Sequence, residues 1–600
     1  MTQTINSPIQ PPQAELKALI TLYKTARYAE LESQSQKLAD EYPNVGILWK
    51  LLGASLNMQT KNALHALQKT AELLPNDAEA HNNLGIALQE REQLDAAMSS
   101  YLHALKINPD FVEAHYNLGN VLCELEQLSE AVKSYRNGLK INPNFATLHS
   151  NLGSTLLELG VFEEALASYR HALVLDPNSV VMRSNLIGIL NYTNSTPAEY
   201  LAEALRYGQI AASKVTQRFT TWKCECTHQR LRVGIVSADL RNHPIGFFLE
   251  SLLTQLNPAR IELIAYTTQT KEDDLTNRIK PYFTKWQSLF GLSDQAAAKL
   301  IHDDGVHILI DLSGHTAHNR LPVFAYKPAP IQVSWLGYFA STGVAEIDYF
   351  LADETGVPES QRANFSETVW YLPDTRLCFT PPLIDLPVAP LPSVKNGYVT
   401  FACFQNLAKL GDEVLMVWGR IFAALPTARL RLASKQLGDA AVASQLTKRL
   451  QQYGIAADRV QMHGAVSRAA YLAAHTEVDI ILDTFPYPGG TTTCEALWMG
   501  VPTLTLAGET LLARQGASLL TAAGLPDWIA NGEGDYVAKA IHFASDLPTL
   551  ATLRAVLREQ IKISPLFDAP RFAKNLEDAL WGMWQAKVGN AATINQEHKA

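Results

Sequence analysis

The pattern of apolar and polar positions divides the chain into two regions. Up to about residue 214, apolar residues recur with helical spacing in short segments that end at Gly, Pro or polar turns. From about residue 230, short β-branched apolar runs alternate with helical segments, which is typical of parallel strands joined by crossover helices. The pattern therefore predicts an all-α region followed by an α/β region.

A repeat of 34 residues organises the helical region. Three full copies carry the same residues at matching positions: Leu84-Gly85, Leu118-Gly119 and Leu152-Gly153; Ala97, Ala131 and Ala165; Tyr101, Tyr135 and Tyr169; Pro109, Pro143 and Pro177. This is the tetratricopeptide signature of paired helices, in which small residues let the helices approach and Pro ends the second helix. Weaker copies precede the full ones, and an incomplete copy leads into a capping helix near residues 197–212. We predict a tetratricopeptide superhelix over residues 14–214.

One position of the repeat is Asn in four successive copies: Asn83, Asn117, Asn151 and Asn185. An Asn side chain carries both a hydrogen-bond donor and an acceptor, so a row of them can pair with an extended peptide backbone of any sequence. The alternative is a structural ladder that serves the repeats themselves. We favour the groove, and predict that these four residues bind a protein or peptide acceptor.

Two series of strands follow the repeats. The first is expected at residues 231–238, 261–267, 306–312, 331–335, 349–351 and 368–372, and the second at 398–404, 430–433, 460–463, 478–482 and 503–506. The proline-rich segment 381–392 separates them. We predict two doubly wound, Rossmann-like halves, whose ligands bind beyond the carboxyl ends of the strands, with the active site in a cleft between them.

The segment 478–501 is the centre of the second half. An apolar strand runs into Pro486-Tyr-Pro-Gly-Gly490, and Thr491 then begins a run with helical spacing that ends at Gly500. Free N–H groups at such a helix N-terminus favour a phosphate, and Glu495 lies within reach of an attached ribose. The alternative is an ordinary strand–turn–helix connection, because a single Gly-rich loop is weak evidence.

Polar residues at other strand ends strengthen the first interpretation. His243 follows the first strand, His315 follows the third, and Leu336-Gly337 follows the fourth. A His on a loop can carry a proton, although each of these taken singly is more often structural. Lys409 follows the first strand of the second half, where a cation would neutralise a diphosphate leaving group. Polar residues after four strands that meet at one cleft together predict an active site.

Composition narrows the class of protein. The 600 residues exceed one core, and a hydrophobic content of 47% with 18% charged residues describes a globular chain. The net charge of -9 and the pI near 6.0 argue against a general nucleic-acid or membrane-surface binder. No apolar run reaches the roughly 18 residues of a membrane span, and no secretory leader begins the chain, so we expect a cytoplasmic protein.

The expected organisation follows from these patterns. We predict a disordered segment 1–13, the repeats 14–214, a linker 215–229, catalytic halves 230–392 and 393–567, a closing helix 568–588 and a disordered tail 589–600. Within the linker, Cys224-Glu-Cys226-Thr-His228 could start a metal site, but no second pair faces it. We therefore expect reduced cysteines there and no metal.

The ordered motifs resemble the O-linked N-acetylglucosamine transferase and SPINDLY family. After the repeats come Asn242-His-Pro, Pro328-Ala-Pro-Ile-Gln-Val-Ser-Trp-Leu-Gly-Tyr338, Asn406-Leu-Ala-Lys409, Leu482-Asp-Thr-Phe-Pro-Tyr-Pro-Gly-Gly-Thr-Thr-Thr493 and Gly508-Glu-Thr510, and the likeness covers roughly residues 45–585. The resemblance implies a metal-independent, inverting glycosyltransferase of the GT-B fold. Such an enzyme moves a sugar from a nucleotide donor, most often UDP-N-acetylglucosamine, to Ser or Thr of a protein, and needs no cofactor.

The same resemblance assigns roles to residues. It implies that Lys409, Thr491 and Thr492 bind the diphosphate and that Glu495 contacts the ribose. Asn406 borders the nucleotide, and His243 lines the reaction centre as a candidate catalytic residue. The remaining expected donor contacts are Leu336, Gly337, His315, Gly490 and Tyr471.

Two positions depart from the family, and they leave alternatives open. Tyr471 stands where many members have His, and its ring can still stack on a base; Gly490 stands where many animal members have His. SPINDLY-like members with similar motifs use GDP-fucose, so O-fucosyl transfer is the alternative activity. A repeat scaffold with an inactive domain is a third possibility, against which the intact Lys409, Thr491, Thr492 and Glu495 argue. The general base is either His243 or a phosphate of the donor.

Overall fold

The computed structural model describes residues 10–193, 195–224 and 230–597. Most of the segment expected to be disordered, 1–13, lies outside these ranges, as do Cys226 and His228 of the expected linker. The chain divides into two compact units, with the boundary between Leu156 and Leu157. In the described ranges, every helix is too short or too polar to cross a lipid bilayer.

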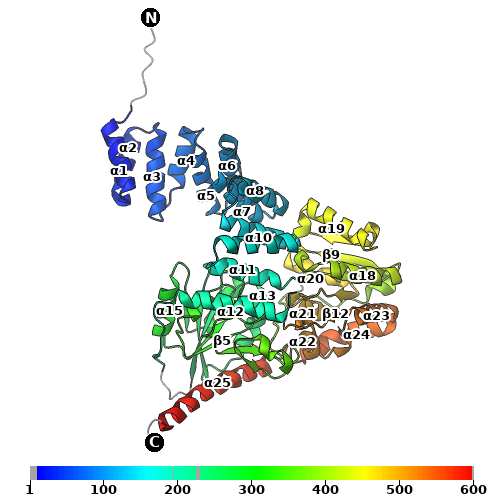
Figure 1. Ribbon diagram of the computed structural model, residues 1–600. Coiled ribbons are helices and arrows are strands. Elements are labelled where there is room, and N and C mark those ends of the chain that lie inside the picture. Colours follow the sequence, from blue (N-terminus) through cyan, green and yellow to red (C-terminus); the bar gives the residue numbers. More distant parts are fainter. Residues whose placement is uncertain (1–9, 194, 225–229, 598–600) are drawn as a thin grey trace. The chain divides into compact units, whose positions relative to one another are not determined.

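The first unit consists of antiparallel helix pairs, drawn in blue in Figure 1. Its helices are α1 (Gln13–Lys24), α2 (Tyr28–Glu41), α3 (Gly46–Met58), α4 (Leu64–Leu73), α5 (Ala78–Gln89), α6 (Leu94–Ile107), α7 (Val112–Glu124), α8 (Leu128–Ile141) and α9 (Ala146–Glu158), which ends just past the boundary. The repeated Gly packs against the repeated Tyr: a Cβ on Gly119 would lie 2.2 Å from the Tyr135 ring. The predicted close approach of paired helices is confirmed.

The second unit begins with the last helices of the repeat region, α10 (Phe162–Leu175), α11 (Val180–Leu190) and α12 (Pro197–Ser213). They do not pack as a separate layer. Ile187 and Tyr207 share one apolar core with Val236 and Ile264 of the first sheet. The compact units therefore divide before α10 and not at residue 214, because the last repeat buries its apolar face against the α/β region.

The first half contains a seven-stranded parallel sheet in the order β3-β2-β1-β4-β5-β6-β7. Its strands are β1 (Leu231–Ser237), β2 (Ile261–Thr267), β3 (Lys285–Ser288), β4 (Ile308–Asp311), β5 (Ile331–Ser334), β6 (Tyr349–Ala352) and β7 (Thr368–Tyr371), and its main helices are α13 (Pro244–Leu253), α14 (Asp274–Ile279), α15 (Asp294–Asp303) and α16 (Leu321–Phe324). Six of these strands were predicted. The edge strand β3 was missed because its Lys-Trp-Gln-Ser sequence has no apolar run.

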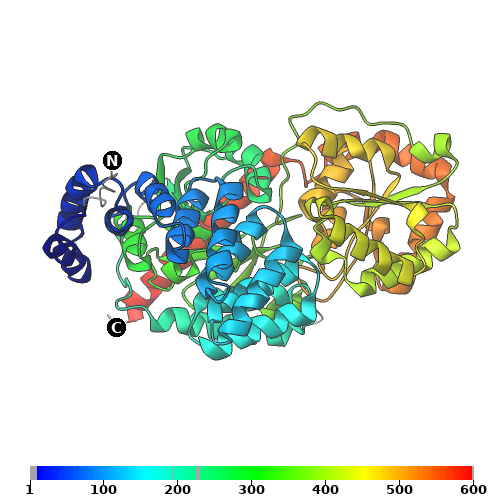
Figure 2. The ribbon, with the colours of Figure 1, turned by 90° about the horizontal axis from the view of Figure 1, so that it is seen from above.

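The second half contains a six-stranded parallel sheet in the order β10-β9-β8-β11-β12-β13. Figure 2 shows helices on both sides of this sheet. The strands are β8 (Thr400–Cys403), β9 (Arg429–Ala433), β10 (Val460–His463), β11 (Ile480–Leu482), β12 (Thr503–Leu506) and β13 (Ile529–Ala530). The helices are α17 (Pro392–Asn396), α18 (Asp412–Ala424), α19 (Ala440–Gln452), α20 (Arg468–Ala474), α21 (Thr491–Trp498), α22 (Gln515–Ala522), α23 (Glu533–Ser545) and α24 (Leu547–Lys562).

The closing helix α25 (Ala569–Glu597) returns from the second half to the first, and in Figure 1 it runs in red beside the green strands. Phe572 stacks on Trp335 at the end of β5, and Glu577 accepts a hydrogen bond from the Asn257 backbone at 2.6 Å. The helix continues to Glu597, through most of the segment 589–600 that we expected to be a disordered tail. No proline follows, and an Ala pair favours continued helix.

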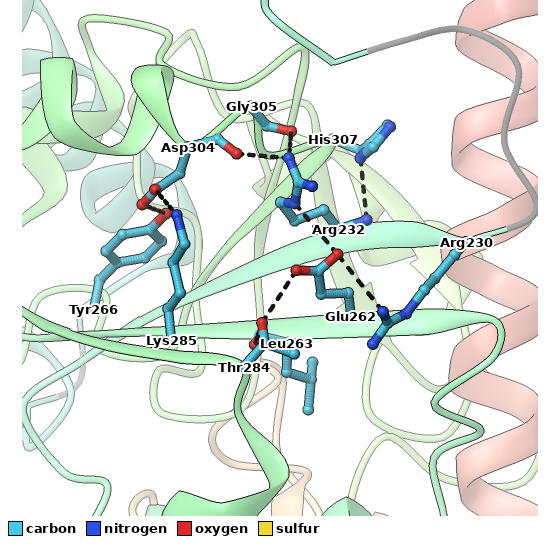
Figure 3. Close-up of polar contacts among 10 residues, drawn as sticks. All are labelled: Arg230, Arg232, Glu262, Leu263, Tyr266, Thr284, Lys285, Asp304, Gly305 and His307. Carbon is cyan, nitrogen blue, oxygen red and sulfur yellow. Dashed lines mark hydrogen bonds and ion pairs between the residues drawn. The ribbon is translucent and has the colours of Figure 1, made fainter.

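Polar contacts fasten the amino-terminal edge of the first sheet (Figure 3). Asp304 accepts hydrogen bonds from Tyr266 at 2.8 Å and from Lys285 at 2.5 Å, and its backbone carbonyl accepts one from Arg232 at 2.7 Å. The Arg232 guanidinium also lies 3.4 Å from Glu262 on β2. These contacts bind the side chains of the amino-terminal edge to one another. In such folds, ligands bind at the opposite, carboxyl edge, to the loops that follow the strands.

The Gly–Tyr contact predicts the effect of a substitution in the repeats. Gly119→Ala should lower the melting temperature, by an amount equivalent to about 1–3 kcal/mol, because Tyr135 is buried and its hydroxyl is bonded to Asn120, so the ring cannot move aside. Gly188→Ala on α11 is the matched control, since a Cβ there meets nothing within 4 Å. Equal melting temperatures for Gly119→Ala and the wild type would contradict this packing.

Candidate functional site

The candidate site lies where the strand order of the second sheet reverses. Strands β8 and β11 are neighbours there, and their connections leave toward opposite faces. Residues 404–409 follow β8 and residues 483–490 follow β11, so both predicted loops meet at the carboxyl edge. This is where doubly wound folds bind ligands.

A buried carboxylate, that of Asp483, connects the two loops through hydrogen bonds. Asp483 accepts hydrogen bonds from the Gly489 backbone at 2.7 Å, the Gln405 amide at 2.5 Å and the Thr505 hydroxyl at 2.7 Å. Burial raises the pKa of Asp483 above its ordinary value, and the hydrogen bonds it accepts oppose that shift. Our sequence analysis missed both Asp483 and Gln405, although an acidic residue directly after an apolar strand was a usable signal.

The Gly-rich loop delivers the chain to the N-terminus of α21. A Cβ on Gly489 would lie 2.6 Å from the Thr492 hydroxyl, so the turn needs glycine there. Gly490, not a threonine, occupies the N-cap position, and no side chain caps the helix. The first N–H groups of α21 thus have no capping side chain, which suits an anion.

A cavity of about 530 Å³ lies in front of this helix. It brings together five predicted site residues: Asn406, Tyr471, Thr491, Thr492 and Glu495. Pro244 of the first half also lines it, which places the neighbouring residue His243 close to its rim. Its size suits a nucleotide-like ligand better than a single ion.

Glu495 is 1% exposed and forms an ion pair with Arg468 of α20. Burial raises the pKa of Glu495, while Arg468 acts in the opposite direction. The Arg468 guanidinium also lies 4.8 Å from the ring centre of Phe247 on α13, so it joins the two halves beside the cavity. Sequence analysis missed Arg468, which follows no strand directly and belongs to no motif that we recognised.

Tyr471 lies beside other rings at the rear of the cavity. Its ring centre is 5.9 Å from that of Phe404 and 5.3 Å from that of His475, both in edge-to-face geometry. Burial raises the pKa of the Tyr471 hydroxyl well above its ordinary value, so the side chain is neutral. The Arg468 guanidinium lies 5.8 Å from the centre of the Tyr471 ring.

Lys409 contacts the Gly-rich loop and is not among the residues that line this cavity. Its ammonium donates a hydrogen bond to the Pro488 carbonyl at 2.9 Å and sits 4.0 Å from the centre of the Tyr487 ring. Burial lowers the pKa of Lys409 to about 8. The lysine lines a second cavity, of about 740 Å³, whose other wall comes from α10 and from Tyr192 after α11.

His243 and the Leu336-Gly337 pair belong to the first half. His243 caps α13, with its Nδ1 atom 3.4 Å from the Ile245 backbone N–H and 3.7 Å from Asp239. Burial lowers the pKa of His243, and Asp239 opposes this. Leu336 has a positive φ of 71°, and a Cβ on Gly337 would lie 1.8 Å from the Leu312 carbonyl oxygen, so backbone packing constrains this turn.

His315, which we expected to contact the donor, is buried in the protein. The side chain is 5% exposed, and its two ring nitrogens are bonded to Ser184 of α11 and to the Thr342 carbonyl, each at 3.0 Å. Burial lowers the pKa of His315 to about 4, which keeps the ring neutral. The loop after β4 turns His315 toward Ser184 of the last repeat, and the expected contact with the donor stays a prediction.

The repeated Asn residues divide into two kinds. Asn117 donates a hydrogen bond to Asn82 at 2.9 Å, and Asn151 donates one to Asn120 at 2.8 Å, so both amides link neighbouring repeats. Asn83 makes no side-chain hydrogen bond to another described residue and lines a cavity of the first unit. Asn117 and Asn151 thus act as a structural ladder, and acceptor binding by the repeated Asn residues stays a prediction.

Comparison with known proteins assigns the family. The model described as glycosyl transferase family 41 matches residues 204–379 and 391–576. The chain belongs to glycosyl transferase family 41. Tetratricopeptide models match residues 87–124, 119–160 and 147–181 of the same chain. The predicted family resemblance is confirmed.

The relatives of this family-41 chain include plant proteins. The chain is 37% identical, over 402 residues, to a Petunia hybrida protein named probable UDP-N-acetylglucosamine–peptide N-acetylglucosaminyltransferase SPINDLY, covering 66% of this chain and 43% of the relative. An Arabidopsis thaliana relative with the same name, SPINDLY, is 35% identical over 66% of this chain and 44% of its own. The chain thus spans less than half the length of these curated relatives.

A solved structure covers more of the molecule. A mutant of the Thermobaculum terrenum O-GlcNAc transferase is 33% identical and superposes with a TM-score of 0.80, over 86% of this chain and 98% of that one. This likeness confirms the predicted fold class of helical repeats followed by a GT-B region of two parallel sheets.

Proposed function

We propose that this family-41 chain transfers a sugar, N-acetylglucosamine from UDP-N-acetylglucosamine, to Ser or Thr hydroxyls of proteins. The observation that carries the proposal is the Gly489–Gly490 loop, which leads into α21 with Glu495, Asn406 and Lys409 around it. Relatives and a solved neighbour that carry this activity in their names support the choice of donor. The other candidate donor is GDP-fucose.

The proposed chemistry is a single displacement. The acceptor hydroxyl oxygen bonds to the anomeric carbon of the sugar while the bond to the diphosphate oxygen breaks, with inversion. The diphosphate lies at the N-terminus of α21, with the Thr491 and Thr492 hydroxyls as further donors, and its growing charge is stabilised by Lys409. His243 or a phosphate oxygen of the donor accepts the hydroxyl proton. We propose that this arrangement works without a resident metal or cofactor.

We further propose that Glu495 binds the ribose and that Tyr471 stacks on the base. Arg468 fixes the Glu495 carboxylate through its ion pair, so the acceptor oxygens have a set direction. Leu336 and Gly337 border the sugar from the first half. We propose that protein acceptors bind along the repeats and that Asn83, which lines a cavity there, pairs with their backbone.

A donor screen tests the proposal. UDP-N-acetylglucosamine, UDP-glucose and GDP-fucose are each supplied with a protein acceptor, with and without EDTA, and transfer is followed by mass spectrometry. Lys409→Ala is the control: its turnover should fall roughly 100-fold or more, because a cation at the leaving group acts mainly in the transition state. Transfer from GDP-fucose alone would replace the proposed donor, and loss of turnover in EDTA would contradict the metal-independent mechanism.

Glu495→Ala separates the ribose contact from a catalytic role. Since a ribose contact acts in the ground state, the Michaelis constant for the donor should rise more than turnover falls. Arg468→Met should act in the same direction, because it leaves Glu495 buried without its partner. Reduced turnover with unchanged donor affinity in Glu495→Ala would reject the ribose assignment.

Asn variants separate acceptor binding from repeat stability. Asn117→Ala and Asn151→Ala each remove a hydrogen bond between repeats, about 0.5–1.5 kcal/mol, and should lower the melting temperature. Asn83→Ala should leave the melting temperature unchanged and weaken glycosylation of long protein acceptors, with donor hydrolysis normal. Wild-type glycosylation by a folded Asn83→Ala variant would exclude Asn83 from the acceptor site.

A further inference from the structure

The Lys409 ammonium has an unusual environment for a cation. Its hydrogen bond goes to a neutral carbonyl, that of Pro488, and the face of the Tyr487 ring lies 4.0 Å away. No carboxylate of the described residues forms an ion pair with it. A cation in such surroundings depends on the ring and the carbonyl to offset its lost hydration.

Tyr487 is itself held by rings from two other parts of the second unit. Tyr192, which follows α11 at the end of the repeats, lies 4.8 Å from it between ring centres, and Phe339 of the first half lies 5.6 Å away at an interplanar angle of 71°. Phe162 of α10 stacks in turn on Tyr192 at 6.0 Å. The ring next to the lysine is thus fixed from the repeat side and from the first half.

We propose that Tyr487 is a positioning residue that keeps the Lys409 ammonium charged and aimed at the Gly-rich loop, and that Tyr192 and Phe339 hold Tyr487 in place. The proposal rests on the proposed function for the role of Lys409. It extends that function, because Tyr192 of the last repeat then helps to position Lys409, the cation that stabilises the leaving group.

The charged groups around Lys409 do not supply the stabilisation of its ammonium that the Tyr487 ring gives. Asp483 raises the pKa of Lys409 through space, as does the Cys403 thiol, but burial outweighs both. Asp412 and Glu413 of α18 line the same cavity, and Asp412 is bonded to Arg449 at 2.7 Å. From α10, Glu163 and Arg170 line the opposite wall with opposite charges.

The cation–π contact with Tyr487 determines in which direction the pKa of Lys409 changes when the ring is removed. A cation–π contact stabilises the charged ammonium, so its loss favours the neutral amine and lowers the pKa of Lys409 from about 8. The protonated form binds an anionic nucleotide. Affinity is therefore fully present below the pKa of the free enzyme and declines as the pH rises through it.

The test compares Tyr487→Leu with the conservative Tyr487→Phe in the full chain. Competitive amine labelling of Lys409 between pH 6 and 10, quantified by mass spectrometry, measures the titration midpoint without any nucleotide. We expect the midpoint of Tyr487→Leu to fall by roughly half a unit to one unit, and that of Tyr487→Phe to match the wild type. An unchanged or higher midpoint in Tyr487→Leu would overturn the proposal.

A second variant and a second measurement complete the design. Tyr192→Leu leaves the Tyr487 ring present without its support, and should lower the titration midpoint of Lys409 by a smaller amount. If thermal unfolding shows that Tyr487→Leu is not folded, the midpoint of Tyr192→Leu tests the proposal instead. UDP and GDP affinities are measured over the same pH range. At pH 8.5, Tyr487→Leu should have lost about 2.5-fold to sixfold more affinity than the wild type, each relative to its own value at pH 6.5. Failure of the wild type to bind either nucleotide would instead reject the proposed function.

Discussion

The buried carboxylate of Asp483 is the constraint on which the candidate site depends. Removed from water, it needs hydrogen-bond donors, and it draws them from three separate segments: the Gly489 backbone, Gln405 after β8 and Thr505 in β12. Satisfying one carboxylate therefore fixes the Gly-rich loop relative to two neighbouring strands. Tyr536 of α23 also donates to the Asp483 carbonyl, at 2.9 Å, so a helix covering the sheet is tied to the same residue.

The two halves of the second unit are joined by polar contacts as well as by apolar packing. Buried Arg376 of the first half donates to Gln515 of α22 at 3.0 Å, and Arg514 donates to the Thr355 carbonyl at 2.7 Å. The Gln515 amide in turn lies 3.4 Å from the Gly489 carbonyl. The first half thereby supports the Gly-rich loop through Gln515, while Arg468 contacts Phe247 and forms a second connection between the halves.

Sequence predicted most of the fold because buried parallel strands carry a continuous apolar signal, and all eleven predicted strands are present. The two that were missed, β3 and β13, are edge strands: one is polar and the other has two residues. Within the site, motifs close to strand ends located Asn406, Lys409, Thr491 and Glu495. Arg468 reaches the cavity from α20, and His315 turns away into the core, since both depend on loop and helix directions that no local pattern encodes.

The shared core of α11, α12 and the first sheet has a consequence for how this architecture changes. Repeat arrays in general gain or lose copies readily, because each copy contacts only its neighbours. Ile187 and Tyr207, in contrast, are buried together with Val236 of β1. The last repeat is therefore not exchangeable in the same way, because its removal would expose apolar surface of the first sheet.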